Sequence, residues 1–250
     1  MLIHHPEGGY GFLPAIQPYS SGVIAGPEWE IVHVRFRTSM PWCGGFGRID
    51  AVLSAVNRPR TALCAIGLRC PVPHPMAGFI SFNDDYFEVL TSWGVLVDGQ
   101  NPVARTNVAP VSDAPAETHL YSFSYTRPRT VDATPSFVVS GAGELHSSEL
   151  VSEAIIRRGE TSADALHEKA TYVMGVMTRR LEGLGVGWDD VTCVNVYTAH
   201  PVDALVEKVV APAGRPAGRN GITLHHTRPP IEEIEFEMDV RGVQTEHLLE

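Results

Sequence analysis

The chain has 250 residues, of which 44% are hydrophobic and 19% are charged, and its formal net charge is −10 with an isoelectric point near 5.5. This composition is ordinary for a soluble globular protein that can bury a core without disulfide staples. The negative charge argues against nucleic-acid-binding classes, which need a basic surface, but allows a small anionic substrate held by one or two local cations.

The cysteine content and the hydropathy of the chain indicate the cellular compartment in which we expect it. Four cysteines occur without a C-x-x-C pair, which favours free thiols in a reducing environment. The first residues contain neither a basic segment nor a long apolar one, and no apolar run is long enough to span a bilayer. We therefore expect a cytoplasmic protein with neither a nucleic-acid nor a membrane partner.

In chain order, the first 126 residues alternate extended and helical patterns. Residues 30–37 alternate apolar and polar side chains, as a half-buried strand does, whereas residues 46–56 place apolar side chains at helical spacing. The elements predicted in this part are strand 21–25, strand 30–37, helix 46–56, strand 61–68, helix 79–97, a strand from about residue 105 and strand 117–125.

A polar, proline-bounded stretch at residues 127–135 is interpreted as a linker between domains at 1–126 and 136–250. The clearest helix follows at residues 161–184, with Thr161 as its predicted cap and glycines at its end. The other elements predicted in this part are strand 136–140, strand 153–158, strand 191–198, helix 202–210 and strand 231–240.

The two halves share an order of elements, which indicates an internal repeat with a period of roughly one hundred residues. Each half alone is thin for an independent core, so we expect its sheet to pack against a neighbour. The predicted fold class is α+β, with helices on one face of a mostly antiparallel sheet.

A short arginine motif recurs in the two halves. Residues 99–110 (GQNPVARTNVAP) and 216–224 (PAGRNGITL) each place a proline, a small residue and an arginine before an alternating apolar run. The planar guanidinium group matches the two oxygens of a carboxylate. Either copy alone would be interpreted as an ordinary surface arginine. The recurrence of the motif favours a carboxylate-binding site.

These and other segments resemble the RidA (YjgF) family. The segments that carry the resemblance are QPYSSGV at 17–23, GFISFNDDY at 78–86, the arginine motifs, GVGWDDVTCVNVYTAHPVDALVEKV from 185 and IEEIEFEMDV at 231–240. The chain resembles a tandem, fused RidA-like protein over most of residues 12–242. The resemblance implies two chorismate-mutase-like repeats, sites in clefts between domains, and a homo-oligomer for which a trimer is favoured.

The resemblance also implies site residues. In that family an arginine binds the substrate carboxylate and a glutamate on the last strand orients a water, while an enamine or imine is hydrolysed to a ketone and ammonia. Carried over to this chain, the candidate catalytic residues are Glu117 and Glu235, and the candidate substrate-binding residues are Arg105, Arg219, Tyr19, Ser140, Gly141 and Asn83. For Glu235 a solvated carboxylate, and for Asn83 local packing, are the competing interpretations.

Neither half keeps the whole family pattern. The first half lacks the Ser-Gly pair, and the second lacks the opening tyrosine motif. A composite cleft with Tyr19 from one half and Ser140 from the other, and one working site beside one degenerate site, both stay open. The adjacent pairs His4-His5 and His225-His226 would point to opposite strand faces, so we predict no metal site and no cofactor.

The resulting hypothesis is a hydrolytic deaminase of a small carboxylate-bearing imine or enamine, such as an aminomuconate-like ring-cleavage product. The alternatives are a non-catalytic protein that binds small metabolites in the same cleft, and an enzyme of the chorismatase or cyclic-amide type on the same fold. Whether Glu117 or Glu235 points into a cleft beside an arginine separates catalysis from binding.

Overall fold

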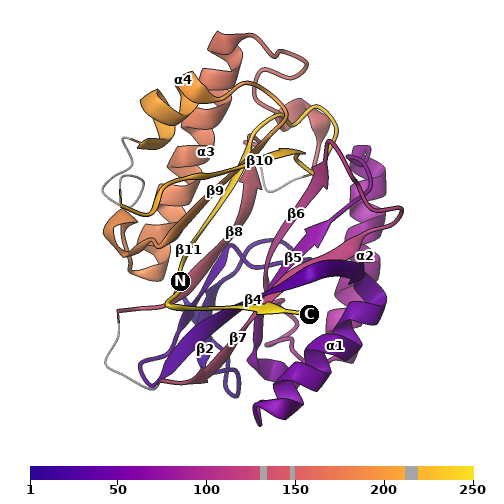
Figure 1. Ribbon diagram of the computed structural model, residues 1–250, viewed down its shortest axis with the longest axis vertical. Coiled ribbons are helices and arrows are strands. Elements are labelled where there is room, and N and C mark those ends of the chain that lie inside the picture. Colours follow the sequence, from indigo (N-terminus) through magenta and orange to yellow (C-terminus); the bar gives the residue numbers. More distant parts are fainter. Residues whose placement is uncertain (130–133, 147–149, 212–218) are drawn as a thin grey trace.

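A computed structural model of the chain describes residues 1–129, 134–146, 150–211 and 219–250. The described residues form a mixed α/β fold with one sheet of twelve strands, in the order β1-β2-β3-β8-β11-β9-β10-β6-β5-β7-β4-β12. Figure 1 shows α3 on one outer side of the molecule, α1 and α2 on another, and the strands of both halves between them.

The strands follow the predicted order, with additional ones at both ends of the chain. They are β1 (Ile3–His4), β2 (Tyr10–Leu13), β3 (Gly22–Ala25), β4 (Trp29–Pro41), β5 (Leu63–Arg69), β6 (Ala104–Pro110), β7 (His119–Pro128), β8 (Phe137–Gly143), β9 (Cys193–Thr198), β10 (Thr223–Arg228), β11 (Glu237–Gly242) and β12 (Thr245–Leu249).

The helices also lie close to their predicted positions. They are α1 (Trp42–Ala55), α2 (Met76–Ser92), α3 (Ala163–Leu184) and the short α4 (Asp203–Leu205), which continues as a π-helical turn over Val206–Val210. No helix in the described ranges is both long enough and apolar enough to cross a membrane.

The strands of the two halves pair in the same way. In the first half β4 and β5 are both antiparallel to β7, and β6 is parallel to β5. In the second half β8 and β9 are both antiparallel to β11, and β10 is parallel to β9. The predicted mostly antiparallel sheet is confirmed, with helices packed against it.

The ends of the chain cross between the halves. The N-terminal strands β2 and β3 form a hairpin that adds to β8 of the second half, whereas the C-terminal β12 runs parallel to β4 of the first half. The halves also meet where β10 pairs with β6, at Thr227 opposite Pro110. This exchange brings β6 and β8, which come from different halves, close together.

Helix α3 forms because its apolar residues recur every three or four positions, which places them along one face. That face is buried against β8, β9 and β11. Ser162, rather than the predicted Thr161, caps the helix by accepting a hydrogen bond from the backbone N–H of Ala165. Gly185 ends it in the left-handed conformation, at φ 77°.

One predicted strand is absent, and another begins later than predicted. Residues 153–158 form a 3-10 turn and a loop in which Arg157 has a φ of 48° and pairs with Glu160. The predicted strand 231–240 begins only at Glu237, because the backbone N–H of Ile234 bonds to the carbonyl of Ile231 in a tight turn. This shift decides which glutamate of the segment enters the site described below.

Candidate active site

Arg105 is a buried cation on β6 with unused hydrogen-bonding capacity. Its Nη2 donates to Oδ1 of Asn83 at 2.6 Å, and its Nη1 has no partner. The rings of Tyr19 and Tyr86 each have their centroid 4.8 Å from the guanidinium carbon. Burial lowers the pKa of Arg105 from its ordinary value, and the group stays protonated at neutral pH.

Ser140 and Gly141 on β8 join the second half to β6. The Ser140 hydroxyl accepts from the backbone N–H of Arg105 at 3.1 Å and donates to the carbonyl of Ser20 at 2.6 Å. The backbone N–H of Gly141 donates to Oγ1 of Thr106 at 3.1 Å. These bonds hold Arg105 at the junction of the two halves.

Glu237 opens β11 and turns its carboxyl toward the same junction. Its side chain is buried, and no described residue donates a hydrogen bond to the carboxyl. Burial raises the pKa of Glu237 well above its usual range, with a further contribution from the nearby carboxylates of Asp239 and Glu144. The cations Arg105 and Arg180 oppose this rise in pKa without reversing it.

The absence of a side chain at Gly141 makes room for Glu237. A Cβ added at Gly141 would collide with Oε1 of Glu237 and stand 3.2 Å from Cγ2 of Thr106. Glycine at this position therefore lets the Glu237 carboxyl occupy its place, through close approach rather than through backbone conformation.

These groups line one cavity of about 480 Å³, which we call the Glu237 cavity. Asn107, on the same strand as Arg105, contributes a buried amide whose Oδ1 and Nδ2 both lack a partner. Arg180 of α3 lines another part of it, and its Nη1 donates to the carbonyls of Ser140 at 2.8 Å and Gly141 at 3.3 Å. A buried polar group without a partner is rare in folded proteins, so these atoms are suited to bind a polar ligand.

The structure brings together some of the residues predicted from the sequence. Those that line or directly support the Glu237 cavity are Tyr19, Asn83, Arg105, Ser140 and Gly141. Because these residues come from both halves, the Glu237 cavity has the composite arrangement that was considered for Tyr19 and Ser140.

Three predicted residues lie elsewhere. Glu235 bonds through its carboxylate to Nε2 of His200 at 2.7 Å and faces a separate shallow pocket beside Arg228. Glu117 is exposed in a bend before β7. Arg219 is exposed as well, and residues 216–218 of its motif lie outside the described residues.

Glu237 was missed because the sequence pattern was followed from the wrong start. With the strand begun at residue 231, Glu235 and Glu237 are equivalent alternating positions. What separates them is the turn at residues 231–234, which leaves Glu235 before the start of β11 and Glu237 on it. Phe236, Met238 and Val240 alternate into the core under α3. That alternation turns Glu237 and Asp239 to the other face of β11.

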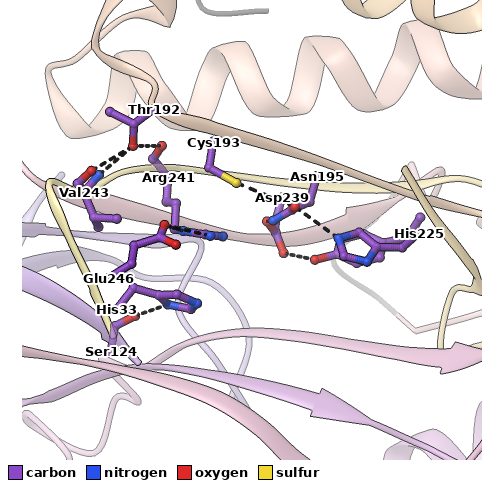
Figure 2. Close-up of polar contacts among 11 residues, drawn as sticks. His33, Ser124, Thr192, Cys193, Asn195, His225, Asp239, Arg241, Val243 and Glu246 are labelled. Carbon is purple, nitrogen blue, oxygen red and sulfur yellow. Dashed lines mark hydrogen bonds and ion pairs between the residues drawn. The ribbon is translucent and has the colours of Figure 1, made fainter. Parts of the chain in front are cut away.

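A second cavity, of about 680 Å³, contains Asp239 and is called the Asp239 cavity. Figure 2 shows its polar groups bonded to one another. Asp239 accepts hydrogen bonds from Nδ2 of Asn195 and from the hydroxyl of Tyr197, each at 2.8 Å. Nε2 of His225 lies 3.1 Å from Oδ1 of Asn195, and burial with the nearby Arg69 lowers the pKa of His225 to about 4.

The remaining charged groups of the Asp239 cavity are largely paired within the protein. Arg241 forms an ion pair with Glu246 at 2.9 Å, and Nδ1 of His33 bonds to the Ser124 hydroxyl at 3.0 Å (Figure 2). The Arg69 guanidinium stacks over the ring of Tyr121 at 3.8 Å. Because the carboxylates here already have partners, this cavity is less suited to proton transfer than the Glu237 cavity.

Comparison with known proteins identifies the family. The sequence profile of the 2-aminomuconate deaminase CnbZ family matches residues 2–247. The chain belongs to this family. A relative described as 2-amino-5-chloromuconate deaminase, from Comamonas testosteroni, is 40% identical over 244 residues, which are 97% of this chain and 96% of the relative. The protein is thus an enzyme of the deaminase class, which acts on C–N bonds.

One solved structure supports the fold. A chorismatase crystal structure aligns with 89% of this chain and 77% of its own, with a TM-score of 0.52 and 11% identity, which is a likeness of fold alone. The YjgF gene product from E. coli aligns with 54% of this chain and 93% of its own, with a TM-score of 0.27 and 15% identity.

Proposed function

We propose that the chain hydrolyses an aminomuconate-type enamine or its imine tautomer to the corresponding 2-oxo acid and ammonia in the Glu237 cavity. The observation that supports this most is that two buried residues line one cavity: Glu237, whose carboxyl receives no hydrogen bond from a described residue, and Arg105, whose Nη1 is free. The family and the relative named above both bear names of aminomuconate-type deaminases.

Arg105 would bind the carboxylate next to the reacting carbon. The guanidinium has an unused Nη1 and lies in a setting largely excluded from water, where a charge-assisted hydrogen bond is strong. Its backbone is fixed by Ser140 and its side chain by Asn83, so little reorganisation is needed on binding. Asn107, with a free donor and a free acceptor, would hold the substrate nitrogen.

Glu237 would move the protons. In its protonated form, which the raised pKa favours, Glu237 gives a proton to the enamine carbon while the nitrogen lone pair forms a C=N bond, which yields an iminium ion. The carboxylate then takes a proton from water as the water oxygen bonds to the iminium carbon and the π electrons return to nitrogen. The product of this step is a carbinolamine.

The same carboxyl completes the reaction. Glu237 passes its proton to the amine, the C–N bond breaks with its electrons leaving on ammonia, and the hydroxyl O–H electrons form the C=O bond. The hydroxyl proton returns to Glu237, which restores the starting state. One enamine and one water give one 2-oxo acid and one ammonia, so no external acid or base is consumed.

We also propose that the chain is a fusion of two RidA-like repeats, in line with the expected domains at 1–126 and 136–250. The identical pairing of β4–β7 and of β8–β11 with their neighbours supports this. Because Arg219 and Glu117 do not meet within the chain, one working site per chain is expected.

A cytoplasmic location and a homo-oligomer, with a trimer favoured, remain predictions. Gel filtration with light scattering would test the oligomeric state.

The function is tested by ammonia release from 2-aminomuconate generated in situ. We expect release by the wild type and by Arg219→Gln, since Arg219 is exposed away from the cavity. Arg105→Gln should raise KM by about 10–100-fold, as expected for loss of a charge-assisted bond to substrate. No release above background by the wild type would overturn the proposal, and equal effects of the two substitutions would remove Arg105 from it.

A further inference from the structure

The Glu237 cavity carries more positive charge than one carboxylate needs. Its described lining residues include three arginines, Arg105, Arg179 and Arg180, against a single carboxyl, that of Glu237. The raised pKa of Glu237 reduces even that negative charge. Arg105 is buried and Arg180 is half-buried, whereas Arg179 is exposed. Leaving the first two cations without a counter-charge is costly, so the described part of the cavity favours an anion with more than one charge.

Arg105 and Arg180 enter the cavity from different elements, β6 and α3. Both guanidinium groups lie close enough to Glu237 to act on its carboxyl electrostatically, and both also act on Tyr19. In the described part of the chain, neither forms an ion pair with a carboxylate. Two separate anchors therefore face the position where the reaction would occur.

Arg180 keeps donors available for a ligand. Its only hydrogen bonds to described residues run from Nη1 to the carbonyls of Ser140 and Gly141, which hold the side chain in place and leave Nε and Nη2 unused. Burial lowers the pKa of Arg180 without making it neutral. A guanidinium fixed at one nitrogen and free at two others is preorganised for a carboxylate.

The remaining lining of the Glu237 cavity suits an apolar, extended molecule. Side chains without charge line this cavity, namely Ile16, Phe79, Leu145, Val176, Ile231 and Ile234. The volume of about 480 Å³ falls within the usual range for small-molecule sites. A short conjugated chain with a carboxylate at each end would match this distribution of charge and apolar surface.

We infer that Arg180 is a second carboxylate anchor, which makes the site selective for conjugated dicarboxylates over monocarboxylates of the same length. This inference rests on the proposed function, and it assigns the two ends of the substrate. The end that carries nitrogen lies at Arg105, because the unpartnered amide of Asn107 is two residues away on the same strand. The distal carboxylate lies at Arg180.

Binding of two unreactive dienes tests the inference separately from catalysis. Muconate and sorbate have the same six-carbon chain, and they differ in that only muconate has a second carboxylate. Calorimetric titration of the wild type should give a Kd for muconate at least about 10-fold below that for sorbate, as one charge-assisted contact provides. Arg180→Gln should reduce this ratio to within about twofold, mainly through weaker muconate binding.

Two further variants control the experiment. Arg180→Lys keeps a positive charge and should retain part of the preference for muconate. Arg48→Gln removes an exposed arginine on α1 and should leave both affinities unchanged. Equal binding of the two dienes by the wild type, or an unchanged ratio in Arg180→Gln, would overturn the inference.

The two proposals fail in different ways. If Arg180→Gln weakens both dienes equally, Arg180 only supports the backbone at Ser140 and Gly141, and the inference fails while deamination can still hold. If the wild type prefers muconate through Arg180 but releases no ammonia from 2-aminomuconate, the dicarboxylate site stands and the proposed reaction is wrong.

Discussion

Glu237 and Asp239 lie two residues apart on β11, both directed away from the core in which Met238 and Val240 are packed, yet their surroundings differ. Asp239 receives hydrogen bonds from Asn195 and Tyr197, whereas no described residue donates to the carboxyl of Glu237. A satisfied carboxylate stabilises the fold, and an unsatisfied one is available for chemistry. We therefore propose that one strand provides a structural carboxyl at Asp239 and a reactive one at Glu237.

The largest expected effect is on catalysis at Glu237. Glu237→Gln removes the only described carboxyl in the cavity that can give and take a proton, and should lower kcat for ammonia release by about 10²–10⁴-fold. The wild-type rate should fall as pH rises through the raised pKa of Glu237, because the protonated form is the one that donates.

The matched control is Glu235→Gln, which changes a neighbouring glutamate that bonds to His200 outside the cavity. Its kcat should stay within about twofold of the wild type, as for a residue that contributes no transition-state contact. A similar loss of kcat in both variants would contradict the assignment of the proton-transfer role to Glu237.

A smaller effect is expected from crowding Glu237. In Gly141→Ala the new methyl group would meet Oε1 of Glu237, and the carboxyl must move from its place. We expect kcat/KM to fall by about 10–100-fold, since a displacement of about 1 Å has such an effect at a reacting group. Gly47→Ala on α1, where nothing lies near the added atom, should behave as wild type.

A substitution at Asp239 should change the stability of the fold rather than the rate of catalysis. Asp239→Asn replaces a two-oxygen acceptor by an amide, so either Asn195 or Tyr197 loses its acceptor. Unfolding in urea should show a loss of about 1–3 kcal/mol, with kcat changed less than about fivefold. Asp84→Asn, an exposed change on α2, serves as the control for the lost charge. A large loss of kcat at unchanged stability would reverse the proposed roles.

Part of this arrangement could be predicted from the sequence. The alternating strands, the apolar stripe of α3 and the turn before Arg105 are local patterns, and they gave the order of elements. Tyr19, Arg105 and Ser140 were found because each lies in a short motif that resembles a known family.

Other parts depend on contacts that no local pattern shows. Glu237 was missed because the turn at residues 231–234 delays the start of β11. Arg180 was missed because only apolar residues of α3 were predicted to point inward, although Arg180 lies on the same face of the helix as Val173 and Leu184. The exchange of β2, β3 and β12 between the halves is also a product of tertiary pairing. Which of two carboxyls receives donors is set by residues far away in the sequence.

The most direct test is the pKa of Glu237 itself, from a ¹³C NMR titration of the glutamate carboxyl carbons, with the signal assigned by its loss in Glu237→Gln. We predict that this carboxyl titrates well above the usual range for glutamate, because it is buried near two other carboxylates and no described residue donates to it. The raised value also implies stability that is present at acid pH and lost as pH rises through that pKa. A Glu237 signal that titrates at or below the ordinary glutamate value would contradict the account.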